Sequence, residues 1–316
     1  MRAVARVVAV ADRHGRTVLR ELRGESPLLL RQAATEEGVP TVYVVGGAAG
    51  PLAGDDLRLS VEVGPGAAVR VRTVAASVAL PGRPGAVSRM RVDAVVHDGG
   101  TLHWLPEQLV AAAGCDHVAG SRVTLAEGAR LLWREELVCG RYGEPAGNVV
   151  VATSVDHAGR PLLRQSLAVG PAAPGWAGPA VLGGATATGS LLVVGPAAAS
   201  GPATVDGGGQ LRGRVLPTGP GASAAWLPLA GGPAALLTAT APDAHTLRTL
   251  LDPAGVAAID PPTPATATGP TPAAPTVSAA ATAPAAAAGP RALPGAGGSV
   301  PDAAGETGWV TAAGRR

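Results

Sequence analysis

Three stretches of the chain repeat one alternation of apolar and polar residues at equal intervals. They cover residues 57–73, 89–105 and 121–137, and each consists of two alternating segments around a glycine-containing turn. Alternation of period two places apolar side chains on one face of a strand and polar side chains on the other, and glycine provides the positive φ of a tight turn. We therefore predict three β-hairpins that stack as layers of sheet, rather than strands that alternate with helices.

The same pattern continues on both sides of this repeat. Residues 3–10 and 17–22 are expected to form an opening hairpin, and residues 149–155 and 162–169 form a weaker fourth copy. Between residues 171 and 235 the chain is rich in Gly and Pro, and its short apolar runs predict further strands at 181–182, 191–194 and 225–229. The fold class is therefore expected to be mainly β, with stacked β-hairpins in a β-helix or solenoid-like arrangement.

Residues 242–251 predict a helix that closes this domain. Pro242 suits the first turn, Asp243 suits the positive end of the helix, and three leucines at 247, 250 and 251 share one face. Beyond this helix the sequence is mostly Ala, Pro, Thr and Gly, and it cannot bury enough apolar surface to offset the entropy of ordering. We expect one β domain over residues 1–258 and a disordered tail over residues 259–316.

Composition narrows the class of protein only slightly. The net charge is +2, so there is no strong electrostatic case for nucleic-acid binding. The two cysteines, Cys115 and Cys139, do not form a disulfide framework. The N-terminus lacks the apolar run and cleavage site of a signal peptide, and no stretch approaches the roughly 18 apolar residues of a membrane span. A cytoplasmic protein is the simplest interpretation.

The glycine-rich loop at residues 46–54 is the first candidate for chemistry. It lacks the Gly-Lys-Ser/Thr ending of a phosphate-binding loop and does not open a helix, so a loop that needs glycine conformations is the stronger interpretation. Asp55 and Asp56 follow it, either as turn caps or as ligands.

The histidines give no clear metal signature. None has the His-Glu-x-x-His spacing, and Cys115 with His117 is a single pair, which we interpret as incidental because zinc sites need about four ligands. Gly-x-Ser-x-Gly is absent from the sequence.

Two strand ends carry more distinctive residues. Trp104-Leu105-Pro106-Glu107 closes the second copy of the repeat, and a loop with Arg141 and Glu144 follows the third, directly after Glu135 and Glu136. Functional carboxylates often lie at strand ends and in loops, although solvent-facing charges are the common alternative there.

Five motifs in this order resemble the urease accessory protein UreD family, called UreH in some systems. The resemblance covers about residues 3–255. The motifs are Pro27-Leu28-Leu29, Gly46-Gly47 with Gly54-Asp55, Thr73-Val74-Ala75-Ala76, Trp104-Leu105-Pro106-Glu107, and Gly140-Arg141 with Glu144.

The resemblance implies a non-enzymatic maturation factor with about two helices beside the β stack. Members of this family assemble with UreF and the GTPase UreG, dock on apo-urease and help to load nickel, which a channel through the UreD-like subunit is thought to carry. No tightly bound cofactor is then expected, only nickel in transit. Two other classes stay open: a generic β-solenoid interaction module without a metal role, and a carbohydrate-active enzyme, which would need paired carboxylates in an open groove.

On this basis we expect carboxylates at strand ends and loops to line a wet passage. Such a passage binds a divalent cation weakly at each point, through oxygen and imidazole ligands. The expected transient ligands are Asp55, Glu107, Glu136, Glu144 and His103. The residues expected to have structural or partner-binding roles are Gly46, Gly47, Gly54, Thr73, Trp104, Pro106 and Arg141.

Overall fold

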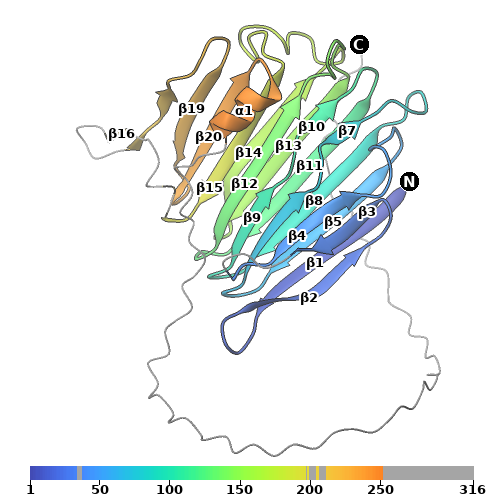
Figure 1. Cartoon of the computed structure of the whole chain (residues 1–316). Coiled ribbons are helices and arrows are strands. Elements are labelled where there is room, and N and C mark those ends of the chain that lie inside the picture. Colours follow the sequence, from blue (N-terminus) through green and yellow to red (C-terminus); the bar gives the residue numbers. More distant parts are fainter. Residues whose placement is uncertain (34–37, 197, 199–203, 206–210, 252–316) are drawn as a thin grey trace, which may run out of the picture. The chain divides into compact units, whose positions relative to one another are not determined.

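The computed structural model of the chain describes residues 1–33, 38–196, 198, 204–205 and 211–251. These residues form two large β-sheets, a small two-stranded sheet and a helix, as Figure 1 shows. The tail predicted over residues 259–316 lies outside the described residues. The predicted mainly β, solenoid-like fold is confirmed.

The first large sheet, here called sheet A, has the strand order β14-β13-β11-β8-β5-β1-β2. Its strands are β1 (Arg2–Ala11), β2 (Thr17–Gly24), β5 (Asp56–Val63), β8 (Ser88–Val96), β11 (Asp116–Leu125), β13 (Asn148–His157) and β14 (Arg160–Val169).

The second large sheet, here called sheet B, has the order β18-β19-β20-β15-β12-β9-β6-β4-β3, and the short strands β7 and β10 extend it beside β12. Residues 204–205 and 211–212 form the separate pair β16 (Thr204–Val205) and β17 (Leu211–Arg212). The strands of sheet B are β3 (Leu28–Gln32), β4 (Thr41–Gly46), β6 (Ala68–Thr73), β7 (Ser77–Ala79), β9 (Thr101–Leu105), β10 (Leu109–Ala111), β12 (Arg130–Val138), β15 (Ala187–Val194), β18 (Arg214–Leu216), β19 (Ser223–Leu229) and β20 (Ala234–Ala241).

The three central copies of the repeat are not hairpins, and this part of the prediction is wrong. In each copy the first strand belongs to sheet A and the second to sheet B, so the two strands do not pair with each other. They pair instead in parallel with the equivalent strands of neighbouring copies: β5 with β8, β8 with β11, β6 with β9 and β9 with β12. Each copy is therefore one coil of a β-solenoid.

The turns between the sheets stack on one another. The Gly66 amide donates to the Asp98 carbonyl in the next coil at 3.2 Å. The Asp98 side chain in turn accepts from the Gly128 amide of the coil after that, at 2.9 Å. A Cβ atom at Gly128 would lie 2.3 Å from Asp98 Oδ1, so this contact requires glycine. Alternation alone could not separate a hairpin from a coil, because both bury one face of each strand and both need glycine at the turn.

The two ends of the repeat do contain true hairpins. β1 pairs antiparallel with β2, and β13 pairs antiparallel with β14, as predicted. Of the later short strands, the residues at 191–194 and 225–229 fall in β15 and β19, whereas 181–182 lie in turns.

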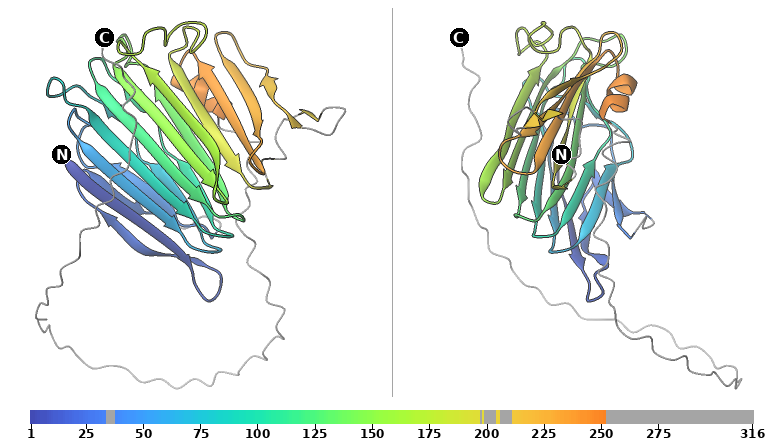
Figure 2. Two further views of the ribbon diagram at one scale, coloured as in Figure 1. Left: turned by 180° about the vertical axis from the view of Figure 1, so that it is seen from behind. Right: turned by 90° about the vertical axis from the view of Figure 1, so that its left-hand side faces the viewer.

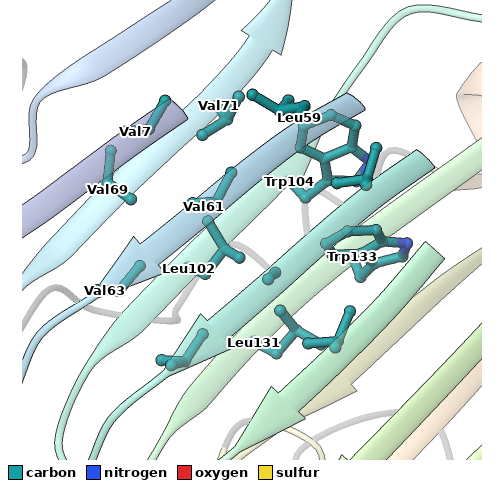
Figure 3. Packing of buried hydrophobic residues seen from close by; sticks show 14 of the residues in the cluster. Val7, Leu59, Val61, Val63, Val69, Val71, Leu102, Trp104, Leu131 and Trp133 are labelled. Carbon is teal, nitrogen blue, oxygen red and sulfur yellow. The ribbon is translucent and has the colours of Figure 1, made fainter. Parts of the chain in front are cut away.

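The main hydrophobic core lies between the two sheets, at the end where the turns stack. Apolar side chains from both sheets meet there, and Figure 3 shows them with Trp104 of β9 above Trp133 of β12. The two indole rings stack with centroids 5.1 Å apart. The labelled members of this cluster are Val7, Leu59, Val61, Val63, Val69, Val71, Leu102, Trp104, Leu131 and Trp133.

The helix predicted at residues 242–251 is α1 (Ala244–Leu251). It packs against β12, β15 and β20 on the outer face of sheet B, and Figure 2 shows it outside the sheets. The Asp243 carboxylate caps it by accepting from the Thr246 amide at 2.7 Å. Within the described residues α1 is the single helix, where the resemblance had implied about two.

Candidate functional site

The end of the interior opposite the stacked turns is hollow. A cavity of about 650 Å³ lies between the sheets where the loops of successive coils cross from sheet B back to sheet A. Its wall includes the glycine-rich loop, the ends of β6, β9 and β12, and the starts of β5, β8 and β11. The ends of strands that are distant in sequence are thus brought together at one place.

Glu135 is the carboxylate that crosses the interior of this cavity. It lies on the same face of β12 as Leu131 and Trp133, but further toward the loops. Its Oε1 accepts from Ser121 Oγ at 2.9 Å and its Oε2 accepts from Thr153 Oγ1 at 2.5 Å, both hydroxyls being on sheet A. The carboxylate therefore bridges the two sheets inside the hollow half of the interior.

His117 also lines the cavity, and its imidazole is neutral. Burial lowers the pKa of His117 to about 4, and Nδ1 lies 2.8 Å from Ser88 Oγ. The Ser88 hydroxyl also lies 3.2 Å from the Asp116 carbonyl. A neutral imidazole keeps one ring nitrogen with a free lone pair, and that nitrogen can accept a proton or bind a cation.

Asp55 stands at the edge of the glycine-rich loop and organises it. The side chain is buried, its Oδ2 accepts from the Leu52 amide at 2.9 Å, and its Oδ1 contacts the Met1 ammonium. Gly54 has a φ of +93°, which favours glycine. Gly46 lines the cavity, while Gly47 donates from its amide to the Pro27 carbonyl at 2.8 Å. This loop is therefore a wall of the cavity that Asp55 holds in shape.

Glu107 and Glu136 are residues of the cavity wall, and the side chain of Glu136 turns to the outer face of sheet B. Both carboxylates bind Arg248 of α1. The Thr73 hydroxyl accepts from the Glu107 amide at 2.8 Å, and the Pro106 carbonyl accepts from Arg134 at 3.2 Å. The Thr-x-Ala-Ala and Trp-Leu-Pro-Glu motifs therefore meet in one hydrogen-bonded corner of the cavity.

The two other expected ligands lie elsewhere. His103 is on the outer face of sheet B, where burial and the nearby Arg70 and Arg72 lower its pKa to about 4. Glu144 binds Arg141 in the loop after β12, and the hydrogen bond from Arg141 lowers its pKa. Neither residue is part of the cavity wall, although Arg141 is.

The structure does not gather the expected ligands into one metal centre. Among the residues that the structure describes, no group of three or more His, Cys, Asp and Glu side chains is placed to hold a metal ion. Asp55, Glu107 and Glu136 share the cavity wall, but each already has a hydrogen-bonded partner.

Sequence reasoning missed the polar groups that line the cavity: Ser121, Glu135, Thr153 and His117, the last of which contacts Ser88. The signal for Glu135 was present, because it follows Leu131 and Trp133 at every second position and so faces the core. For His117 the sequence offered no comparable signal, because its partner Ser88 comes from a neighbouring coil.

Comparison with known proteins relates the chain to one family. The family model "UreD urease accessory protein" matches residues 2–267. The chain is 48% identical over 258 residues to Urease accessory protein UreD 3 of Streptomyces griseus subsp. griseus, covering 80% of this chain and 95% of the relative. It is 45% identical to Urease accessory protein UreD of Streptomyces avermitilis (80% and 96% covered) and 43% identical to that of Frankia alni (81% and 94%).

The chain is thus a member of the UreD family of urease accessory proteins, and the resemblance seen in its motifs is confirmed. Within the described residues, no helix has the length and apolar character needed to cross a membrane.

Proposed function

We propose that this chain is a non-enzymatic maturation factor that passes nickel toward apo-urease, in a cytoplasmic complex with UreF-like and UreG-like partners. Nickel is cargo in transit, and no cofactor is held tightly. The observation that carries the proposal is the Glu135 carboxylate, which lies inside a cavity between two sheets and accepts hydrogen bonds from the hydroxyl groups of Ser121 and Thr153.

The chemistry of the cavity wall suits a divalent cation that must leave again. Carboxylates, hydroxyls and a neutral imidazole are acceptable ligands for a cation of intermediate hardness. A passage works when each binding point is favourable enough to admit the ion and weak enough to release it. Glu135, Asp55 and His117 are separate binding points of this kind rather than one closed coordination shell.

The test replaces Glu135 with Gln, which keeps the shape of the side chain and removes the charge. We expect the complex with UreF-like and UreG-like partners to assemble normally and the rate of urease activation at limiting nickel to fall about tenfold, equivalent to roughly 1.4 kcal/mol in the barrier. The matched control is Glu62→Gln, which removes a half-exposed carboxylate paired with Arg6 on the outer face of sheet A.

Full activation by the Glu135→Gln variant in an assembled complex would contradict the passage and favour a simple interaction module. Loss of assembly in the same variant would instead place Glu135 in the framework of the fold.

A further inference from the structure

Arg248 joins α1 to two carboxylates of sheet B at once. Its Nε donates to Glu136 Oε1 at 2.6 Å. Its two terminal nitrogens donate to Glu107, at 3.3 Å to Oε1 and 3.0 Å to Oε2. One guanidinium therefore lies between a carboxylate on β12 and a carboxylate at the exit of β9, and both carboxylates belong to residues of the cavity wall.

The position of Arg248 depends on how closely α1 approaches the sheet. Leu247 and Leu251 are fully buried beneath the helix. Gly189 of β15 makes room for them, because a Cβ atom there would lie 2.7 Å from Leu251 Cδ1. When α1 is docked, these contacts hold the guanidinium over Glu107 and Glu136.

Glu136 is the least usual member of this cluster. Its side chain is only 1% exposed, and its Oε1 is shared by Arg248 and by Arg134, whose Nε lies 2.9 Å away. Its second oxygen, Oε2, is buried and has no hydrogen-bond partner among the described residues. A buried carboxylate oxygen that accepts no hydrogen bond is unfavourable. Glu136 Oε2 is therefore available to bind a further donor or a cation.

We propose that Arg248 is a tethered cation that occupies a divalent-cation site formed by Glu107 and Glu136, so that cation binding there and docking of α1 compete. The inference rests on the proposed cation passage, and it adds a way in which the passage is regulated. A cation that reaches this cluster beneath α1 meets two carboxylates already paired with the guanidinium of Arg248.

The ligand set fits such a cation. Two carboxylates, with the unpartnered Glu136 Oε2 among their four oxygens, and the nearby Pro106 carbonyl offer oxygen ligands for Ni²⁺ or a similar divalent ion. If cation and helix compete, the coupling is reciprocal: the cation weakens the docking of α1, and removal of Arg248 strengthens the binding of the cation.

The experiment measures Ni²⁺ binding to the full chain by calorimetry, without urease or partner proteins. We expect Arg248→Gln to bind Ni²⁺ at this site about tenfold more tightly than the unaltered chain, and the double variant Arg248→Gln/Glu136→Gln to lose that gain. The matched control is Arg23→Gln, which breaks the exposed Arg23–Glu25 pair away from the cavity and should leave the affinity unchanged.

Hydrogen exchange of the unaltered chain supplies a second measurement that needs no variant. Addition of Ni²⁺ should speed amide exchange in residues 244–251, while strands β12 and β15 stay protected. The inference is overturned if Arg248→Gln binds Ni²⁺ no more tightly, or if Ni²⁺ leaves exchange in α1 unchanged or slows it. Neither measurement depends on urease activation, so this result is independent of the Glu135 test.

Discussion

Along one strand, β12, the space between the two sheets changes from filled to hollow within two residues. Leu131 and Trp133 pack into the apolar half of the interior, whereas Glu135, the next residue on the same face, reaches across a cavity to hydroxyls of sheet A. The pairing of β12 with β15 continues through this point, whereas the pairing of β12 with β9 ends at Trp133. The hollow half therefore begins where β9 leaves the sheet: the apolar half holds the sheets together, and the hollow half is free to carry chemistry.

Shortening one buried side chain in each half should give the largest difference in the free energy of unfolding between the two halves. Leu102→Ala in the apolar half should lower the free energy of unfolding by about 2–5 kcal/mol, because it opens a void in a close-packed region. Leu167→Ala, beside the cavity, should cost less than about 2 kcal/mol, because it only enlarges an existing hollow. Urea denaturation measures both values. Equal losses would mean that the cavity half is packed as tightly as the core.

The buried His117 on the hollow side should make the stability of the fold depend on pH in the acidic range. The pKa of His117 is about 4 in the folded chain and near 6.5 when unfolded. Between these values only the unfolded chain binds the proton, so stability falls as the pH is lowered from about 6.5 to about 4 and is unaffected above that range. The loss attributable to His117 should approach about 3 kcal/mol.

Denaturation midpoints at pH 7 and pH 4.5 provide the measurement, with His117→Gln as the comparison. The denaturation midpoint of His117→Gln should change less between pH 7 and pH 4.5 than that of the unaltered chain.

The smallest contrast comes from adding one hydroxyl to each half. Val123→Thr puts a hydroxyl into the apolar half at a fully buried position and should cost about 1–3 kcal/mol, because the hydroxyl finds no partner there. Val151→Thr places the same group on the cavity wall, where polar neighbours are within the same hollow, and should cost about 1 kcal/mol or less. Thermal unfolding measures the loss of stability in each variant. A larger loss for Val151→Thr than for Val123→Thr would contradict the assignment of an apolar half and a hollow half.

Much of the β structure could be predicted from alternation, whereas the partners of each strand could not. The opening hairpin and the helix at α1 both follow from local patterns. The central copies were assigned the wrong pairing, because the same alternation suits a hairpin and a coil. The family motifs indicate the class of protein correctly. Two of them meet in the structure, in the corner that contains Thr73, Pro106 and Glu107.

The candidate site was only partly predictable, for a physical reason. The sequence predicts Glu136 as a ligand because it is a charged residue near a strand end. Its side chain turns to the outer face beneath α1, and its neighbour Glu135 faces the cavity. Contacts such as that between Arg248 and Glu107 join residues far apart in the chain, and only the packing of the helix on the sheet brings them together.

The hairpins at the two ends of sheet A have a consequence for self-association. Parallel strands β5, β8, β11 and β13 repeat the same register, so a bare edge of this stack would offer a template to a second molecule. The antiparallel returns β2 and β14 occupy the two outermost positions and carry exposed arginines, among them Arg23, Arg160 and Arg164. Charged side chains on an outermost strand disfavour pairing with a second copy. The charged hairpins at the two ends of sheet A therefore disfavour growth of the repeating ladder from one molecule to the next.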